Sequence, residues 1–377
     1  MSKLGKLSLA IASAGFLVLA AASQAKSAVL EYENSIGSPG FAPGQLAVPQ
    51  GIAIDPKNNN VVVADGGNDR LSIFDQSGNF IKTIGSKGSG PGQFKEPAAV
   101  TYSPINGNLY VGDVFNNRVD VLDPQGNFLS SFGSFGGQRP DRVFYGPGGA
   151  TFDKAGNFYI ADFSNDNIQV YDQNNTLIKN IGTNGTGDGQ FNGPAGVAIS
   201  KTTGNIYVTD QYNNRIQVLD KDGKFIRAFG GPGNGIGQFA QPIGIEVDEN
   251  DNIYVADSIN SRVQVFDQNG KFIESYGTPA GAPPGPTDPP FGKPLNLAPG
   301  VFNWTAGEHY ENGKLYVGDF FQGRIQVLKV NSPAKVPEST PVFGLGLLAA
   351  IAAASTLKKR SSKSVLDLTK KLEKTAV

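Results

Sequence analysis

The chain has 377 residues, 49 of them glycine, with no cysteine, one histidine and a formal net charge of −1. The missing cysteines exclude disulfides, thiolate metal sites and thiol nucleophiles, and a single histidine excludes a histidine-rich metal cage. The glycine content is well above the usual ~7%. Since the chain has no helix-period runs, this excess indicates many short strands joined by tight turns.

The first 25 residues have the pattern of a secretory signal peptide. Lys3 and Lys6 precede an apolar run from Leu7 to Ala22, and small residues follow up to Ala25. A basic start, a short apolar run and a small-residue cleavage site are typical of an export signal. We expect cleavage after Ala25. A retained membrane anchor is the alternative, and the shortness of the run argues against it.

Six copies of one unit occupy residues 29–330. In each copy an Asp ends one alternating segment, and in five copies an Arg five residues later begins the next segment. The six Asp residues are 48, 49, 48, 47 and 62 residues apart. These residues are Asp65 with Arg70, Asp113 with Arg118, Asp162, Asp210 with Arg215, Asp257 with Arg262, and Asp319 with Arg324. Period-two alternation of β-branched and aromatic residues is typical of strands.

Each copy contains four such runs, and four short strands every ~48 residues predict one blade of a β-propeller. The sixth copy ends at Val330 without its fourth strand, whereas an unassigned alternating segment, Val29–Ile36, precedes the first copy. We therefore predict an all-β, six-bladed β-propeller of four-stranded antiparallel blades. The N-terminal strand closes the last blade, which removes open sheet edges. Short helical segments are expected at both termini.

The repeats resemble NHL repeats. The NHL pattern of Tyr-Val-x-Asp, Asn-x-Arg-(Ile/Val)-Gln-Val and Gly-x-Gly-x-Gly-x-Phe is present here, for example in Asn205–Asp210 and Arg215–Asp220. The resemblance covers residues 29–330. WD and YWTD propellers would need one Trp per blade, and this chain has only Trp304.

The repeated Asp and Arg residues are expected to stabilise the individual blade, because a ligand has no sixfold copy of itself. Each Asp would accept backbone hydrogen bonds in the loop between the second and third strands. Binding is expected where the symmetry breaks, at the insertions Ser134–Tyr145 and Thr278–Pro299 and after the repeated Asp residues. The predicted ligand-binding residues on this face are Phe115, Arg139, Arg142, Phe144, Tyr145, Phe163, Tyr212, Phe320 and Phe321. Aromatic rings and arginines on loops suit a carbohydrate or a peptide.

The first strands are expected to line a central channel. Aligned positions there are Thr101, Thr151, Glu246 and Asn303, whose oxygen atoms would allow a Ca²⁺ ion. A water-filled channel is the alternative, since a single carboxylate holds a hard cation poorly. Propeller lactonases use more carboxylates, and NHL-type amidating lyases need histidine ligands. This chain offers only His309, in the irregular approach to the sixth copy, so we predict no cofactor and no catalytic residue.

The C-terminal segment resembles the PEP-CTERM sorting signal of exosortase substrates. A linker (331–341) leads into sixteen uncharged residues (342–357) and a basic tail (358–377). The residues that carry the resemblance are Val336, Pro337, Glu338, Ser339, Thr340 and Pro341, then Lys358, Lys359 and Arg360. Two departures are Ser339 in place of Pro and a long extension after Arg360. The resemblance implies signal peptidase and an exosortase-like enzyme as partners; a plain tail anchor in the membrane is the alternative.

The charge of the repeat region bears on its partners. Residues 26–330 carry 22 basic and 30 acidic residues, a net charge of −8, which argues against nucleic acid as a ligand. We therefore expect an exported, monomeric, non-catalytic module that binds a protein or polysaccharide of the cell envelope or extracellular matrix. The alternative is a metal-dependent propeller lyase or lactonase with its site in the central channel.

Overall fold

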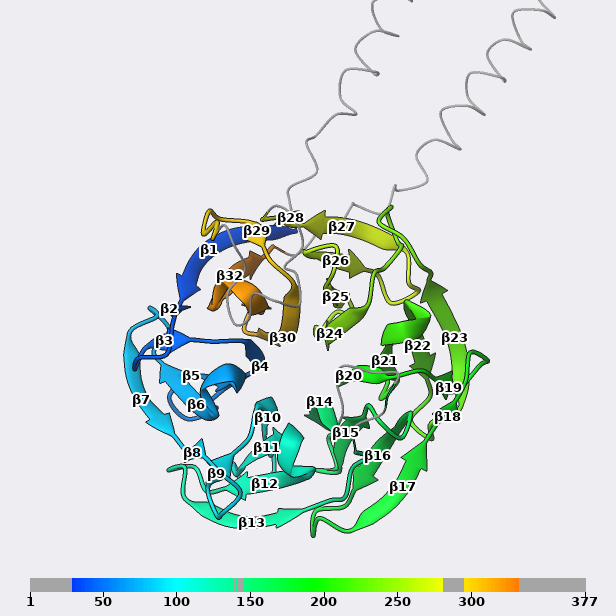
Figure 1. The fold of residues 1–377 in the computed structure, drawn as a ribbon. Coiled ribbons are helices and arrows are strands. Elements are labelled where there is room, and N and C mark those ends of the chain that lie inside the picture. Colours follow the sequence, from blue (N-terminus) through cyan, green and yellow to red (C-terminus); the bar gives the residue numbers. More distant parts are fainter. Residues whose placement is uncertain (1–28, 138–139, 141–145, 281–294, 332–377) are drawn as a thin grey trace, which may run out of the picture. The chain divides into compact units, whose positions relative to one another are not determined.

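The computed structural model describes residues 29–137, 140, 146–280 and 295–331. Six four-stranded antiparallel sheets stand around a central opening (Figure 1). The predicted six-bladed β-propeller is confirmed, and the terminal segments expected to be helical lie outside the described residues. Among the residues described, no helix has the length and apolar character needed to span a membrane.

The first three blades have the same element order. Blade one consists of β4 (Pro49–Ile54), β5 (Val61–Asp65), β6 (Arg70–Phe74) and β7 (Phe80–Ile84). Blade two consists of β10 (Pro97–Tyr102), β11 (Leu109–Asp113), β12 (Arg118–Leu122) and β13 (Phe128–Phe132). Blade three consists of β14 (Pro147–Phe152), β15 (Phe158–Asp162), β16 (Asn167–Tyr171) and β17 (Leu177–Ile181).

The last three blades repeat this order. Blade four consists of β20 (Pro194–Ile199), β21 (Ile206–Asp210), β22 (Arg215–Leu219) and β23 (Phe225–Gly230). Blade five consists of β24 (Pro242–Val247), β25 (Ile253–Asp257), β26 (Arg262–Phe266) and β27 (Phe272–Tyr276). Blade six consists of β30 (Thr305–Glu311), β31 (Lys314–Asp319), β32 (Arg324–Val330) and β1 (Leu30–Ile36).

Short elements connect the blades and their strands. One-turn 3-10 helices follow the repeated Asp in four blades: η1 (Gly66–Asn68), η2 (Val114–Asn116), η3 (Gln211–Asn213) and η4 (Phe320–Gln322). Two-residue parallel pairs lie between blades: β2 (Ser38–Pro39) with β3 (Gln45–Leu46), β8 (Ser86–Lys87) with β9 (Gln93–Phe94), β18 (Thr183–Asn184) with β19 (Gln190–Phe191), and β28 (Thr278–Pro279) with β29 (Val301–Phe302).

The N-terminal strand closes the ring, as the sequence predicts. Strand β1 pairs antiparallel with β32, from Leu30 opposite Val330 to Ile36 opposite Ile325. The backbone N–H of Asn331 also donates to the carbonyl oxygen of Val29, at 2.8 Å. The two ends of the repeat region are therefore held in one sheet, and the outer edge of β32 is paired with β1.

Each hydrophobic core is shared by two neighbouring blades. One core joins Ala53 and Val62 of blade one to Val100 and Val111 of blade two. Another joins Ala198 of blade four to blade five in the same way. A blade therefore buries its apolar face only when its neighbour is present, so the six blades stabilise one another around the ring.

The repeated Asp is the centre of a polar cluster within each blade. In blade four, Asp210 accepts hydrogen bonds from the backbone N–H of Asn192 (2.7 Å), the amide of Asn213 (2.9 Å), Nε of Arg215 (2.7 Å) and the amide of Gln217 (3.0 Å). Asp65 and Asp257 have matching partners, including Nε of Arg70 and of Arg262. The acceptor capacity of these buried carboxylates is thus used inside the blade.

A second repeated position connects successive blades. The residue before the repeated Arg has a left-handed backbone, and its side chain accepts a backbone N–H from the next blade. Asp69 accepts from Glu96 at 2.9 Å, Asp166 from Gly193 at 2.7 Å, and Asn214 from Gln241 at 2.8 Å. In blade five the corresponding acceptor is Ser261, to which the backbone N–H of Trp304 donates at 3.1 Å. These four pairs are inter-blade contacts. The Asn-Asn-Arg motif therefore serves both the blade and its junction.

The first strands approach one another at their third residue, which is glycine in five blades. A Cβ added to Gly51 would lie 2.3 Å from the carbonyl oxygen of Ala98, and one added to Gly307 would lie 2.3 Å from that of Gln50. Neither position has room for a side chain. The inner wall of the ring is therefore main chain at this level.

Candidate functional site: the central cavity

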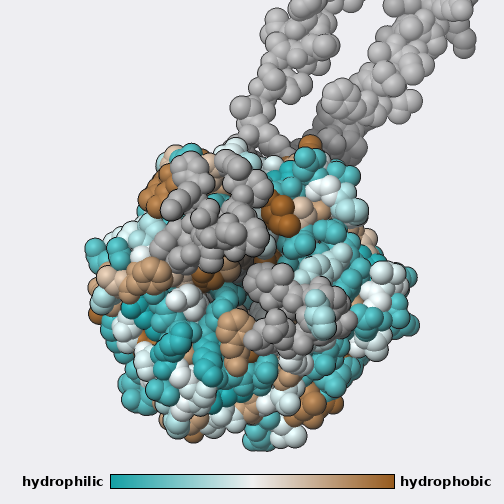
Figure 2. Space-filling view, in the orientation of Figure 1, coloured by the Kyte–Doolittle hydropathy of each residue, from teal (hydrophilic) through white to brown (hydrophobic). Residues whose placement is uncertain are grey.

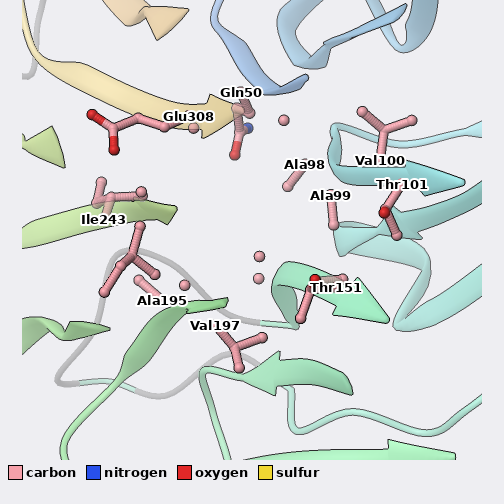
Figure 3. Close-up of a pocket in the computed structure, with 18 of the residues that line it drawn as sticks. Gln50, Ala98, Ala99, Val100, Thr101, Thr151, Ala195, Val197, Ile243 and Glu308 are labelled. Carbon is pink, nitrogen blue, oxygen red and sulfur yellow. The ribbon is translucent and has the colours of Figure 1, made fainter. Parts of the chain in front are cut away.

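A cavity of about 220 Å³ lies at the axis of the ring. All six first strands, β4, β10, β14, β20, β24 and β30, contribute to its wall (Figure 3). The lining runs from Gln50 near the start of its strand to Tyr310 near the end of its strand. The cavity thus follows the axis past both ends of the inner strands.

The fourth residue of each first strand faces the neighbouring blade. In five blades this residue is aliphatic: Ile52, Val100, Ala150, Val197 and Ile245. In blade six it is Glu308, opposite Val317 of β31. Figure 3 shows the Glu308 side chain extending from β30 into the space between β30 and β24. Blade six therefore has a carboxyl group at the position where the other five blades have an aliphatic side chain.

Within the residues that the structure describes, the Glu308 carboxyl is buried without a hydrogen-bond donor or a cation that would compensate for its burial. Its residue is 7% exposed, and neither carboxylate oxygen makes a hydrogen bond of normal geometry within the described part of the chain. Burial, together with the charge of Glu246, raises the pKa of Glu308 well above its ordinary value. The backbone amide of Ala256 acts in the opposite direction and does not offset these effects.

The fifth residue of the first strands supplies two neighbours of Glu308. Glu246 holds this position on β24, opposite Tyr254, and His309 holds it on β30, opposite Tyr316. Nδ1 of His309 lies 3.4 Å from Oε1 of Glu246, so the two side chains meet across the junction of blades five and six. Glu246 and Glu308 are called the carboxylate pair below.

The sequence alignment of the sixth blade was wrong at this position. Asn303, expected in the channel, lies before β30, where its backbone N–H donates to Asp319 at 2.8 Å and where it does not line the cavity. His309, expected in an irregular approach, is part of β30. The reason is that blade six begins its first strand with Thr305 instead of the Pro that marks the other five.

The other predicted channel residues, Thr101 and Thr151, do line the cavity. A further carboxylate, Glu96, lines it from the loop before β10 and accepts a hydrogen bond from the amide of Gln50 at 3.3 Å. Burial, and secondarily the charge of Asp69, raises the pKa of Glu96 to about 7. The cavity therefore holds carboxyl groups at two separate levels.

The predicted ligand-binding residues fall into three groups. Phe115 is 41% exposed and lines the cavity, whereas Phe163 and Phe320 line it as buried residues, 4% and 7% exposed. Tyr212 and Phe321 are half-buried against Phe163 and Phe320, with ring centroids 5.6 and 4.8 Å apart respectively. Arg139, Arg142, Phe144 and Tyr145 lie outside the described residues.

The buried position of Phe163 and Phe320 differs from the exposed aromatic rim that the sequence suggests. Each follows its repeated Asp directly, and that backbone position points inward, toward the axis, in these blades. Figure 2 shows the face of the ring as mostly hydrophilic, with hydrophobic residues scattered singly. Phe115, Phe163 and Phe320 therefore lie at the cavity.

The chemistry available in the cavity is acid–base and ionic. It contains the carboxylates Glu96, Glu246, Glu308 and Glu311, against the cations Lys201 and, when protonated, His309. Within the described ranges, no three His, Asp or Glu side chains converge closely enough to hold a metal ion. Of the four residues predicted for a Ca²⁺ site, Thr101, Thr151 and Glu246 line the cavity and Asn303 does not.

The comparisons with known proteins agree with the fold. A family model described as "6-bladed beta-propeller" matches residues 53–132 and 197–281. A protein of unknown function from Bacteroides thetaiotaomicron is similar, with 19% identity, a TM-score of 0.57, and coverage of 79% of this chain and 75% of that one. The chain is a β-propeller of six blades. A search among curated proteins found no match.

Two solved enzymes share the architecture. A gluconolactonase from Xanthomonas campestris has 11% identity and a TM-score of 0.55, with 80% of this chain and 99% of that chain covered. Virginiamycin B lyase from Staphylococcus aureus, in a catalytically inactive form with quinupristin, has 14% identity and a TM-score of 0.53, with coverage of 80% and 100%. At these identities the likeness is one of fold.

The unpaired carboxyl of Glu308 should make stability depend on pH. The unfolded chain releases this proton near pH 4.5, whereas the folded protein keeps it to higher pH, so the free energy of unfolding falls as the pH rises above that value. Glu308→Ile, which restores the residue of Ile52 and Ile245, should therefore stabilise the protein by about 1–3 kcal/mol at pH 8 and by less at pH 4.5. Thermal unfolding at both pH values measures this. The exposed Glu31→Ile is the control, and an equal gain at both pH values would contradict the assignment.

Proposed function

We propose that this protein is an exported NHL-type propeller of the cell envelope that binds a ligand, protein or polysaccharide, at its central cavity. The observation that supports this proposal is the position of the residues that are not repeated from blade to blade. The repeated Asp and Arg residues form hydrogen bonds within the blades. Phe115, Phe163 and Phe320, in contrast, occupy positions whose residue varies between blades, and all three line the cavity. Binding that depends on residues peculiar to single blades suits one asymmetric ligand.

The proposed location depends on the two ends of the chain. The signal-peptide pattern of residues 1–25 lies outside the described residues, and so does the PEP-CTERM-like segment from residue 332 to residue 377. They support the division into signal peptide, propeller (29–330), linker, apolar anchor segment and basic tail. Cell fractionation with intact-mass measurement of the mature protein tests this part: full-length protein in the cytoplasm would contradict it.

The binding proposal is tested at Phe115. Its ring is substantially exposed at the cavity, so Phe115→Ala should leave the fold intact and weaken ligand binding at least tenfold, as expected for an aromatic contact residue. Envelope polysaccharides and proteins captured by the wild type would be titrated against the variant. Ile236→Ala, which removes a more exposed side chain that does not line the cavity, is the matched control. Equal binding by Phe115→Ala would refute the cavity as the binding site.

One observation favours a second candidate function. The cavity brings His309, Glu246 and Glu308 together, and groups of this kind can transfer protons to and from a substrate. A lyase or lactonase acting in the cavity is therefore the alternative, with His309 and the carboxylate pair as acid and base. Turnover of a lactone or of quinupristin that is lost in His309→Ala would favour the enzyme over the binding module.

A further inference from the structure

Among the described residues, the carboxyl groups of Glu246 and Glu308 have no cationic partner within ion-pair distance except His309. Four carboxylates line the cavity against one lysine and one histidine. Glu308 is more than nine-tenths buried, and its two oxygens have four lone pairs with no donor of normal geometry among the described residues. Buried carboxylates are normally paired with a cation or hydrogen-bonded. Among the described residues, the Glu308 carboxyl has neither a cationic partner nor a hydrogen-bond donor of normal geometry.

The neighbours of the pair do not supply that charge. His309 contacts Glu246, at 3.4 Å, and lies on the strand that carries Glu308. Tyr254, opposite Glu246, donates its hydroxyl to Asp248 at 2.9 Å and is thereby engaged elsewhere. The side chains on β24, β25 and β30 therefore provide no partner for the oxygens of Glu308, both of which are enclosed in the wall of the cavity.

We propose that the Glu246–Glu308 carboxylate pair binds the ammonium or guanidinium group of a small organic cation that enters the central cavity. This rests on the proposed function of ligand binding at that cavity and adds the chemical class of the group bound. A protonated amine offers three N–H donors and a guanidinium five, which match two carboxylates and restore the missing compensation. The cavity, at about 220 Å³, far exceeds the ~15 Å³ that one water needs.

The wall around the pair suits the rest of such a molecule. The second residues of the first strands include Ala98, Ala195, Ile243 and Ala306, which are small or aliphatic and line the cavity (Figure 3). A short hydrocarbon chain attached to the cationic group would lie along them. The carboxyl of Glu96, at a separate level of the same cavity, provides an acceptor for a second cationic group.

The probe for this proposal is putrescine, with the neutral 1,4-butanediol as its isosteric partner. Isothermal titration of the wild type at pH 8 and low salt should show binding of putrescine and none of the diol. Glu308→Gln and Glu246→Gln should each weaken putrescine binding at least tenfold, because each removes one of the two charges. Glu31→Gln, which removes an exposed carboxylate that does not line the cavity, should bind as the wild type does.

Three outcomes would overturn the proposal: equal affinity for the diol, unchanged affinity in both Gln variants of the pair, or binding of Ca²⁺ with no binding of the diamine. Its failure is distinct from failure of the proposed function. If envelope ligands bind and depend on Phe115 while putrescine does not bind, the cation site is refuted and the binding module stands. If no ligand of any class binds at the cavity, both are refuted.

Discussion

Replacement of Asp210 by alanine should lower the free energy of unfolding by about 3–5 kcal/mol, because it removes a fully buried carboxylate that pairs with the half-buried Arg215. The carboxylate is fully buried and accepts hydrogen bonds from the backbone of Asn192 and the side chains of Asn213, Arg215 and Gln217. All four donors would lose this acceptor at once. Urea denaturation followed by circular dichroism measures the loss.

The matched control for this prediction is the exposed Asp188, in the same blade junction, whose replacement by alanine should change stability by less than about 0.5 kcal/mol. Asp210→Asn separates charge from shape, since it keeps the size of the side chain. A loss of under 1 kcal/mol in Asp210→Ala would show that the polar cluster is dispensable. The repeated Asp would then need an explanation other than blade stability.

Removal of the N-terminal strand is the second large effect. A chain that begins at Gly37 loses Val29, Leu30 and Ile36, which are 1%, 2% and 0% exposed. Burial of such side chains contributes roughly 2–3 kcal/mol each, so the loss is comparable with the ~5–15 kcal/mol stability of a typical domain. The variant should aggregate, since it also exposes the edge of β32.

The control for this deletion is a permuted chain in which the β1 segment is moved from the N-terminal to the C-terminal side of the propeller. Val330 is opposite Leu30, so the segment 29–36 placed after Asn331 through a short turn would form the outer strand as an ordinary hairpin. This permuted chain should recover the melting temperature and solubility of the wild type. A deletion variant that stays soluble and melts as the wild type does would show that closure by β1 is not needed.

The fold was predictable because its signals are repeated. Six spaced Asp residues and four alternating runs per copy left few alternatives, and the lack of a fourth strand after β32 implied that an earlier segment must supply it. The inter-blade bonds of Asp69, Asp166 and Asn214 were not predicted. Their motif had been assigned to the blade alone, and no sequence pattern states which backbone N–H a side chain will meet.

The candidate site was predictable only in part. Glu246, Thr101 and Thr151 follow from strand alternation, whereas Glu308 was missed because blade six was aligned without its usual Pro. Gly307 offered the signal that would have corrected this, since glycine two residues after the strand start is shared with Gly51, Gly196 and Gly244. The unpaired state of Glu308 has no sequence signature, because it depends on what surrounds the side chain in three dimensions.

The glycine contacts between first strands set the width of the channel, whereas the side chains beside them set its chemistry. A Cβ at Gly196 would lie 2.4 Å from the carbonyl oxygen of Ile243, and one at Gly244 would lie 2.5 Å from that of Ala306. The aperture is therefore fixed by peptide groups that no substitution elsewhere can move apart cheaply. Residues close to these glycines, such as Glu246 and Glu308, can be substituted in one blade without a change in the others. A propeller of this kind can therefore acquire a new ligand selectivity while the width of its channel stays the same.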